Sequence, residues 1–226
     1  MTNNNIYLAG DSTVCNYDPS VAPRTGWGQV LNEFLNDDVI VNNHASSGRS
    51  SKSFIQEGRL DEITNQLQAN DYLFIQFGHN DSKPDEERHT DPFTSFKANL
   101  NQFIQQARNK QAIPVLVTPV QRRSFNEDGS LIDTHGDYAV AIREVAQESD
   151  VPLIDLAAHS HTLYEQLGPE KTKKLFLWFT PGEYLNYPDG IQDDTHFSEY
   201  GAREIAKLVI QSIQDIHLPL VTKLKS

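Results

Sequence analysis

Two short stretches of this chain carry side chains that could together cleave an ester. Gly10-Asp11-Ser12-Thr13 places a serine directly after an apolar run, and Asp193-Asp194-Thr195-His196 places a carboxylate three residues before an imidazole. A serine hydroxyl is a weak nucleophile at neutral pH until a base takes its proton, and a third group must orient that base. Ser12, His196 and Asp193 are therefore candidates for nucleophile, base and orienting acid. A hydrolase is the first hypothesis.

Two further positions could stabilise the negative charge that develops on an attacked carbonyl oxygen. Gly48 lies in a small polar loop, where a glycine lets its N–H approach a ligand closely. Asn80 follows the apolar run Tyr72–Phe77, and its amide could donate a hydrogen bond to the same oxygen. Each of these residues, and Ser12 too, is equally compatible with an ordinary turn when taken alone. Ser12 also lacks the G-x-S-x-G pattern, because Val14 stands where the second glycine belongs.

A metal site is the competing interpretation of Asp193 and His196, since both side chains are common ligands. No H-x-x-x-H or equivalent spacing completes a ligand set, and Cys15 is the one cysteine, which excludes an internal disulfide and a thiolate cluster. The loop around Gly48 lacks the spaced glycines and the lysine of a phosphate-binding loop. We therefore expect neither a metal nor an organic cofactor.

Short apolar runs alternate with stretches of helical period along the whole chain. The candidate strands, rich in β-branched and aromatic residues as buried parallel strands tend to be, are Ile6–Ala9, Val39–Asn42, Tyr72–Phe77, Val115–Thr118 and Leu153–Asp155. Helical spacing joins the apolar residues Phe93, Phe96, Leu100, Phe103, Ile104 and Ala107. Further helices are expected over Tyr138–Val145 and after Ser198, a suitable N-cap. This alternation predicts an α/β fold with a parallel sheet covered on both faces.

Ligands of open parallel sheets bind beyond the carboxyl ends of the strands. Ser12, Gly48 and Asn80 each follow a candidate strand, and Asp193 and His196 lie on an expected turn before the last helix. The five residues should therefore meet at one edge of the sheet. Two long loops are expected, 78–92 and 176–197, and neither has the composition of a linker. We expect a single domain over residues 1–226.

The charge composition of the chain limits the classes of partner that it can bind. The net charge of −12 opposes binding to phosphate backbones and anionic lipid surfaces, so neither nucleic acid nor membrane is expected as a partner. No stretch approaches the roughly 20 apolar residues of a membrane helix. The polar start Met1–Asn5 lacks the charged and apolar segments of a secretory signal. These features predict a cytoplasmic protein.

Taken together, the motifs resemble the SGNH (GDSL-like) hydrolases. Four blocks match in order: Gly10-Asp11-Ser12, Gly48, Gly78-His79-Asn80-Asp81 and Asp193-x-x-His196. The surrounding residues are similar to the rhamnogalacturonan acetylesterase branch, through Asn43-x-Ala45, Ser47-Gly48-Arg49-Ser50-Ser51, Phe77-Gly78-His79-Asn80-Asp81 and Asp193-x-Thr195-His196-Phe197. Thr13, where many lipases of the group carry leucine, favours that branch. The resemblance extends from Ile6 to Ile210.

The resemblance implies a three-layer α/β/α fold whose five-stranded parallel sheet has flavodoxin-like order. It also implies a serine esterase that removes O-acetyl groups from pectin-derived oligosaccharides. Ser12 would be the nucleophile, His196 the base and Asp193 its partner, with Gly48, Asn80 and the Ser12 N–H in the oxyanion hole. An SGNH lysophospholipase or thioesterase remains an alternative, as does a non-enzymatic carbohydrate-binding or nucleotide-binding module. The adjacent Asp194 raises the question of whether a second acid also acts on His196.

Residues for substrate binding are predicted on simpler grounds. Aromatic side chains commonly pack on sugar rings, and guanidinium groups pair with the carboxylates of uronic acids. Ordinary packing and surface roles are equally compatible with these side chains. The candidates are Arg49, His79, Arg122, Arg123, Trp178, Tyr184 and Tyr187.

Overall fold

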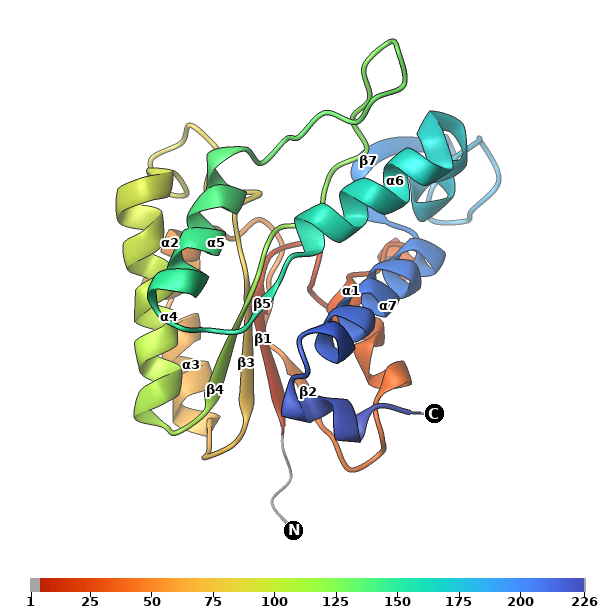
Figure 1. Cartoon of the computed structure of the whole chain (residues 1–226). Helices are drawn as coiled ribbons and strands as arrows, with labels where there is room; N and C mark the ends of the chain where they lie inside the picture. Colours follow the sequence, from red (N-terminus) through yellow and green to blue (C-terminus); the bar gives the residue numbers. More distant parts are fainter. Residues whose placement is uncertain (1–4, 226) are drawn as a thin grey trace.

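Five parallel strands form the central sheet of the structure, a computed structural model that describes residues 5–225 (Figure 1). The strands are β1 (Ile6–Gly10), β2 (Val41–Asn43), β3 (Tyr72–Gln76), β4 (Ile113–Val117) and β5 (Leu153–Ile154). Their order is β2-β1-β3-β4-β5, which is the flavodoxin-like order. The α/β class and all five expected strands are confirmed, with bounds shifted by at most two residues. The polar segment of residues 1–4 lies outside the described part of the chain.

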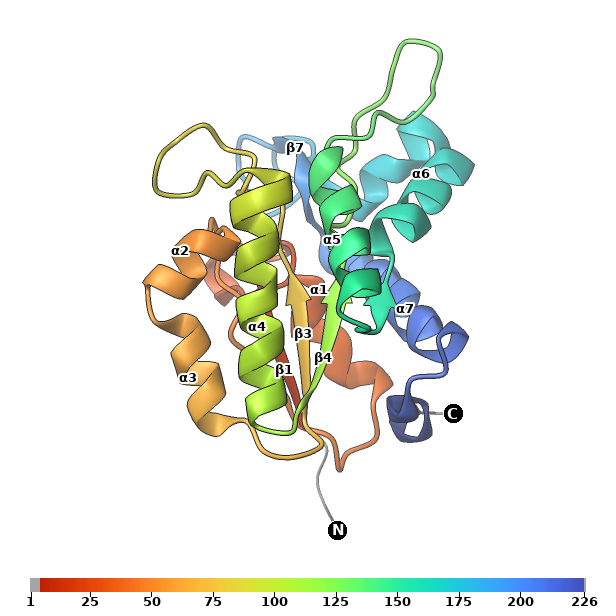
Figure 2. The same ribbon diagram turned by 60° about the vertical axis from the view of Figure 1, so that its left-hand side comes forward.

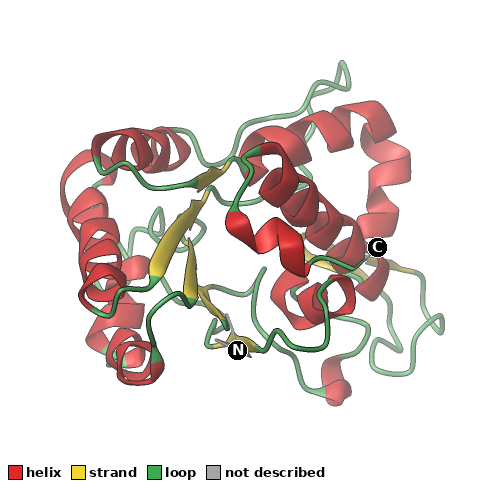
Figure 3. Cartoon of the chain, turned by 60° about the horizontal axis from the view of Figure 1, so that its bottom comes forward, coloured by secondary structure: helices red, strands yellow, loops and turns green. Residues whose placement is uncertain are grey.

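Helices cover both faces of the sheet, because alternate side chains of each strand point to opposite sides. Ile6 and Leu8 of β1 belong to one apolar core, and Tyr7 and Ala9 belong to the other. The first core is closed by α1 (Trp27–Val30), α6 (Leu156–Thr172) and α7 (Glu199–Asp215). The second is closed by α2 (Ser51–Gln56), α3 (Arg59–Gln66), α4 (Lys97–Asn109) and α5 (Asp137–Glu148). Figures 2 and 3 show the resulting three layers from the side and from below.

The expected helices are present, with one difference. The Ser198 hydroxyl accepts a hydrogen bond from the Gly201 N–H and so caps α7, and α5 contains the whole of 138–145. Phe93 was expected on the buried stripe of α4, but its side chain is 45% exposed. It lies outside α4, in the π-helical turn Pro92–Phe96 that precedes the helix and is capped by Asp91. The other five residues of the stripe are fully buried.

The segment 176–197 is not the loop that was expected. β6 (Phe176–Phe179) pairs with β7 (Ile191–Phe197) in a separate antiparallel hairpin. Phe176 lies opposite Phe197, whereas Leu177 lies opposite Asp193, so β7 bulges over residues 194–196. Asp193 and His196 therefore stand on a bulged strand rather than on a turn. Only the tip of the hairpin, 180–190, is a loop, whereas the expected loop 78–92 contains no helix or strand before Pro92.

Among the described residues, no helix combines the length and the apolar character needed to cross a bilayer.

Candidate active site

Ser12 is presented by a tight turn at the carboxyl end of β1. The Asp11 carbonyl accepts hydrogen bonds from the N–H groups of Val14 and Cys15, at 3.2 and 3.1 Å, so the chain reverses directly after the strand. The Ser12 side chain projects from this turn, and the residue is 8% exposed. Its Oγ lies 3.0 Å from His196 Nε2, the distance of a hydrogen bond between a nucleophile and its base.

The bulge of β7 holds the imidazole and its carboxylate. His196 Nδ1 lies 2.7 Å from Asp193 Oδ2, while Asp193 Oδ1 accepts the N–H groups of Thr195 and His196 at 2.8 and 3.0 Å. Burial alone raises the pKa of Asp193, but the hydrogen bonds from His196 and Thr195 outweigh burial and bring this pKa down to about 2. Asp193 is therefore ionised at neutral pH and fixes the Nδ1–H tautomer of His196, which leaves Nε2 to accept a proton from Ser12.

Three candidate hydrogen-bond donors, Ser12, Gly48 and Asn80, lie on the chain after the neighbouring strands β1, β2 and β3. Within residues 5–225, the N–H groups of Ser12 and Gly48 have no protein acceptor. Gly48 has a φ of +81°, a left-handed conformation that glycine adopts without strain. Asn80 Nδ2 donates one hydrogen bond to the Arg49 carbonyl at 3.0 Å, which fixes the amide, and its second N–H has no acceptor in the described part of the chain. These donors have the chemistry that an oxyanion hole requires.

The buried carboxylate of Asp81 links these loops. Asp81 is fully buried and accepts hydrogen bonds from Ser51 Oγ at 2.5 Å and from the N–H of Gly78 at 3.0 Å. Thr90 Oγ1 donates to it as well, at 3.2 Å. Asp81 thus joins the loop that contains Gly48 to the loop that contains Asn80. Its place in the Gly78–Asp81 motif was the sequence signal for this role.

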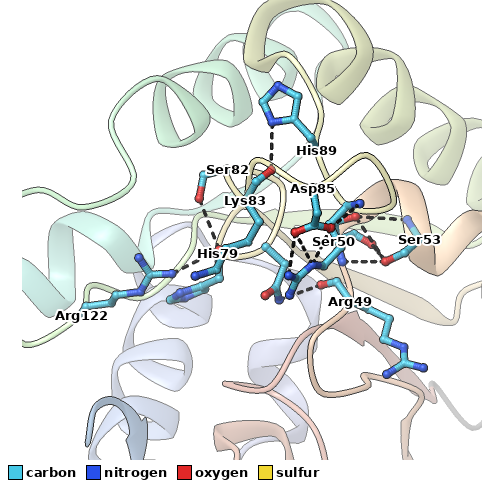
Figure 4. Close-up of polar contacts among 11 residues, drawn as sticks. Arg49, Ser50, Ser53, His79, Ser82, Lys83, Asp85, His89 and Arg122 are labelled. Atoms are coloured by element: carbon cyan, nitrogen blue, oxygen red, sulfur yellow. Dashed lines mark hydrogen bonds and ion pairs between the residues drawn. The ribbon is translucent and has the colours of Figure 1, made fainter.

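Of the candidate substrate residues, His79 is buried and Arg122 beside it is half-buried. His79 is 2% exposed, and its Nδ1 lies 3.1 Å from Nε2 of the equally buried His135. Burial lowers the pKa of His79 well below its ordinary value and that of His135 to about 3, so both rings are neutral. Arg122 donates a hydrogen bond to the His79 carbonyl at 3.2 Å (Figure 4). These contacts support the backbone next to Asn80.

Arg49 has a more open position. Figure 4 shows its guanidinium extending away from His79. The Arg49 Nε pairs with Glu57 at 3.0 Å, and Arg49 lines a cavity of about 330 Å³ together with Gly48 and Arg88. Of the predicted substrate residues, Arg49 is the one that shares a cavity with an oxyanion candidate.

Arg123 and Trp178 converge on Asp194 instead of on His196. Asp194 Oδ1 accepts hydrogen bonds from Arg123 Nη1 at 2.8 Å and from Trp178 Nε1 at 2.7 Å. The Arg123 guanidinium also stacks over the indole, 4.6 Å from the ring centroid, and donates to the Pro169 carbonyl. The two adjacent acids therefore act on different partners: Asp193 contacts His196, and Asp194 holds the hairpin to the loop that follows β4.

Tyr184 and Tyr187 lie at the hairpin tip. The Tyr187 hydroxyl donates to the Val21 carbonyl at 2.9 Å, and the Tyr184 ring packs on Phe179 with centroids 4.1 Å apart. Trp178 and Tyr184 also line a cavity of about 660 Å³ that none of Ser12, Asp193 and His196 reaches.

Two features had no signal in the sequence. Arg24, in the segment before α1, donates a hydrogen bond to Asp193 Oδ2 at 3.3 Å across 169 positions of the chain. His135 follows no motif, and only the folded chain brings it to His79. In the part of the chain that the structure describes, no group of three or more His, Cys, Asp or Glu side chains could hold a metal ion.

The sequence and the fold are similar to those of known esterases. The chain is 51% identical over 221 residues to the rhamnogalacturonan acetylesterase RhgT of Bacillus subtilis (strain 168), covering 98% of this chain and 94% of that protein. It is 44% identical to the probable rhamnogalacturonan acetylesterase YesY of the same strain, covering 96% and 95%. The crystal structure of Bacillus subtilis YxiM superposes with a TM-score of 0.82 at 31% identity, covering 96% of this chain and 58% of YxiM. The model of the GDSL-like lipase/acylhydrolase family matches residues 8–204, and the chain belongs to this family.

Proposed function

We propose that this protein is a carbohydrate acetylesterase that removes O-acetyl groups from rhamnogalacturonan oligosaccharides through an acyl-enzyme on Ser12. The observation that carries the proposal is the continuous hydrogen-bonded path from Ser12 Oγ through His196 to Asp193, with distances of 3.0 and 2.7 Å. The substrate class rests on the two Bacillus subtilis relatives, which are 51% and 44% identical over nearly the full chain.

In the first step, Ser12 Oγ forms a bond to the acetyl carbonyl carbon while its proton passes to His196 Nε2. The electron pair of the C=O bond moves to the oxygen, where the N–H groups of Ser12 and Gly48 and the amide of Asn80 stabilise it. Asp193 stabilises the imidazolium that forms. The C–O bond to the sugar then breaks, and His196 returns the proton to the departing sugar oxygen.

In the second step, water replaces the sugar as the nucleophile. His196 takes a proton from water, whose oxygen bonds to the acyl carbon of the Ser12 ester. Collapse of this intermediate releases acetate and returns the proton to Ser12 Oγ. The same three donors serve both steps, because the oxyanion forms at the same position.

Substrate contact is assigned to Arg49, which is the predicted residue beside Gly48. In the acidic galacturonan part of the substrate, a carboxylate can take the place of Glu57 as the partner of this guanidinium. The other six candidates make internal contacts that support the loops and the hairpin, and we assign them no direct contact with sugar.

Acetate release from a panel of substrates tests the proposal. Acetylated rhamnogalacturonan oligosaccharides should be deacetylated faster than acetylated xylan oligosaccharides, and p-nitrophenyl acetate faster than the decanoate. Ser12→Ala should release no acetate above background. Preference for the long acyl chain would instead indicate a lysophospholipase or thioesterase, and activity in Ser12→Ala would refute the assigned nucleophile.

A further inference from the structure

We propose that Arg24 is a positioning residue for the acid–base pair, a role that rests on the proposed functions of Ser12, His196 and Asp193. Within residues 5–225, Asp193 is the sole hydrogen-bond acceptor of the Arg24 side chain, at 3.3 Å from Nη2. The oxygen it contacts, Oδ2, is the one that lies 2.7 Å from His196 Nδ1. Arg24 therefore reaches the atom through which Asp193 orients the imidazole.

The contact completes the support of the carboxylate. Two backbone N–H groups of the β7 bulge fix Oδ1, whereas among residues 5–225 the donors to Oδ2 are His196 and Arg24 alone. Without Arg24, the carboxylate can rotate about its bond to the rest of the side chain and draw the imidazole with it. Since the imidazole must stay aligned with Ser12 Oγ, such rotation reduces the fraction of reactive geometries.

Arg24 is itself held in place from the nucleophile side. Its guanidinium lies over the ring of Tyr17, 5.6 Å from the centroid, and the Tyr17 hydroxyl donates to the Ser12 carbonyl at 2.7 Å. The neighbouring Thr25 N–H donates to the Phe197 carbonyl at 3.1 Å. The segment 17–25 thus contacts both the turn that carries Ser12 and the strand that carries His196.

The hairpin tip anchors the middle of this segment. Asn186 Nδ2 donates to the carbonyls of Pro19 and Ala22, at 3.2 and 2.9 Å, and the Tyr187 hydroxyl donates to that of Val21. The hairpin tip therefore helps to hold the segment that carries Arg24. Tyr187 contributes to this support from a position far from the reacting atoms.

The competing explanation is that the Arg24–Asp193 ion pair only stabilises the fold. The solvent exposure of the two side chains helps to distinguish this explanation from a positioning role. The side chains of Arg24 and Asp193 are 24% and 19% exposed, so solvent reaches the pair and partly screens its effect on stability. A positioning role instead acts on turnover and leaves substrate affinity unchanged.

The test compares kcat and KM for p-nitrophenyl acetate in Arg24→Ala, Arg24→Lys and the wild type. We expect kcat to fall about 10- to 100-fold in Arg24→Ala, with KM within about two-fold of wild type. Arg24→Lys should recover most of the loss. Methylguanidine should restore part of the activity of Arg24→Ala, because Arg24 lines an open cavity of about 320 Å³ through which it can enter. The rate at which a fluorophosphonate labels Ser12 should fall in parallel with kcat.

Arg203→Ala is the matched control. Arg203, on α7, pairs with Glu33 and Glu199 and contacts none of the three proposed catalytic residues, so the kcat of Arg203→Ala should match that of the wild type. An unchanged kcat in Arg24→Ala would overturn the inference. So would a loss that neither lysine nor methylguanidine recovers. Ser12→Ala, measured alongside, tests the proposed function separately, since its activity does not depend on the role of Arg24.

Discussion

Asp11 is a fully buried carboxylate directly before the proposed nucleophile. Its Oδ1 accepts hydrogen bonds from the Thr13 N–H and Oγ1, at 2.9 and 2.8 Å, while Oδ2 has no partner among the described residues. Burial raises the pKa of Asp11 to about 6, although the hydrogen bonds from Thr13 lower it in part. The turn that presents Ser12 thus buries the Asp11 carboxylate, and its ionised form destabilises the fold.

This arrangement predicts how stability changes with pH. Between pH 3.8 and pH 6, folded Asp11 keeps a proton that the unfolded chain gives up, so the free energy of unfolding decreases as pH rises through this window. Asp11→Asn removes this titration. Relative to the wild type, the variant should gain on the order of 3 kcal/mol between pH 4 and pH 7, measured by urea unfolding at both pH values.

Asp37→Asn, at a fully exposed side chain, is the control for general charge effects. If Asp11→Asn and the wild type lost stability in parallel over this range, Asp11 would not be the buried acid that the structure describes.

The β6–β7 hairpin is the element in which adjacent acids have separate roles. Asp193 contacts His196, whereas Asp194 joins Arg123 and Trp178 and so fastens the hairpin to the loop after β4. The Arg123 side chain is only 10% exposed, so removing Asp194 leaves a largely buried cation without its ion-pair partner.

Alanine variants of Asp193 and Asp194 should therefore differ in which property they lose, activity or stability. Asp194→Ala should lower the free energy of unfolding by about 1–3 kcal/mol and keep most of the activity. Asp193→Ala should lose about 10⁴-fold in kcat, as expected when the orienting acid of a serine–histidine pair is lost. Thermal unfolding and acetate release, measured on both proteins, check the contrast. Equal losses of activity in the two variants would show that Asp194 also acts on His196.

The strands of this hairpin could not be predicted from the sequence, in contrast to those of the central sheet. Buried strands such as β1 and β3 are short apolar runs, which is why their ends were predicted closely. β7 contains Gln192, Asp193 and Asp194 and bulges at its polar residues, so it has neither an apolar run nor strict alternation. α6 was not predicted because its apolar residues form no clear stripe of helical period.

Across the whole molecule, three residues of the candidate site could be placed from the sequence because they follow a topological rule, whereas Asp193 and His196 stand on a separate hairpin. Ser12, Gly48 and Asn80 come after strands of one parallel sheet, and the carboxyl ends of those strands share an edge. The contacts that support the site follow no such rule. Arg24 reaches Asp193, and His79 reaches His135, through packing between distant loops, for which a single sequence contains no spacing signal.

The central claim at the scale of the whole molecule is that the fold converts one ordinary serine among many into a nucleophile. Covalent labelling by a fluorophosphonate, mapped by peptide mass spectrometry, tests this claim most directly. We predict a single adduct, on Ser12, that forms rapidly in the wild type, far more slowly in His196→Ala and not at all in Ser12→Ala. An adduct on another residue, or equally fast labelling of Ser12 without His196, would contradict the account.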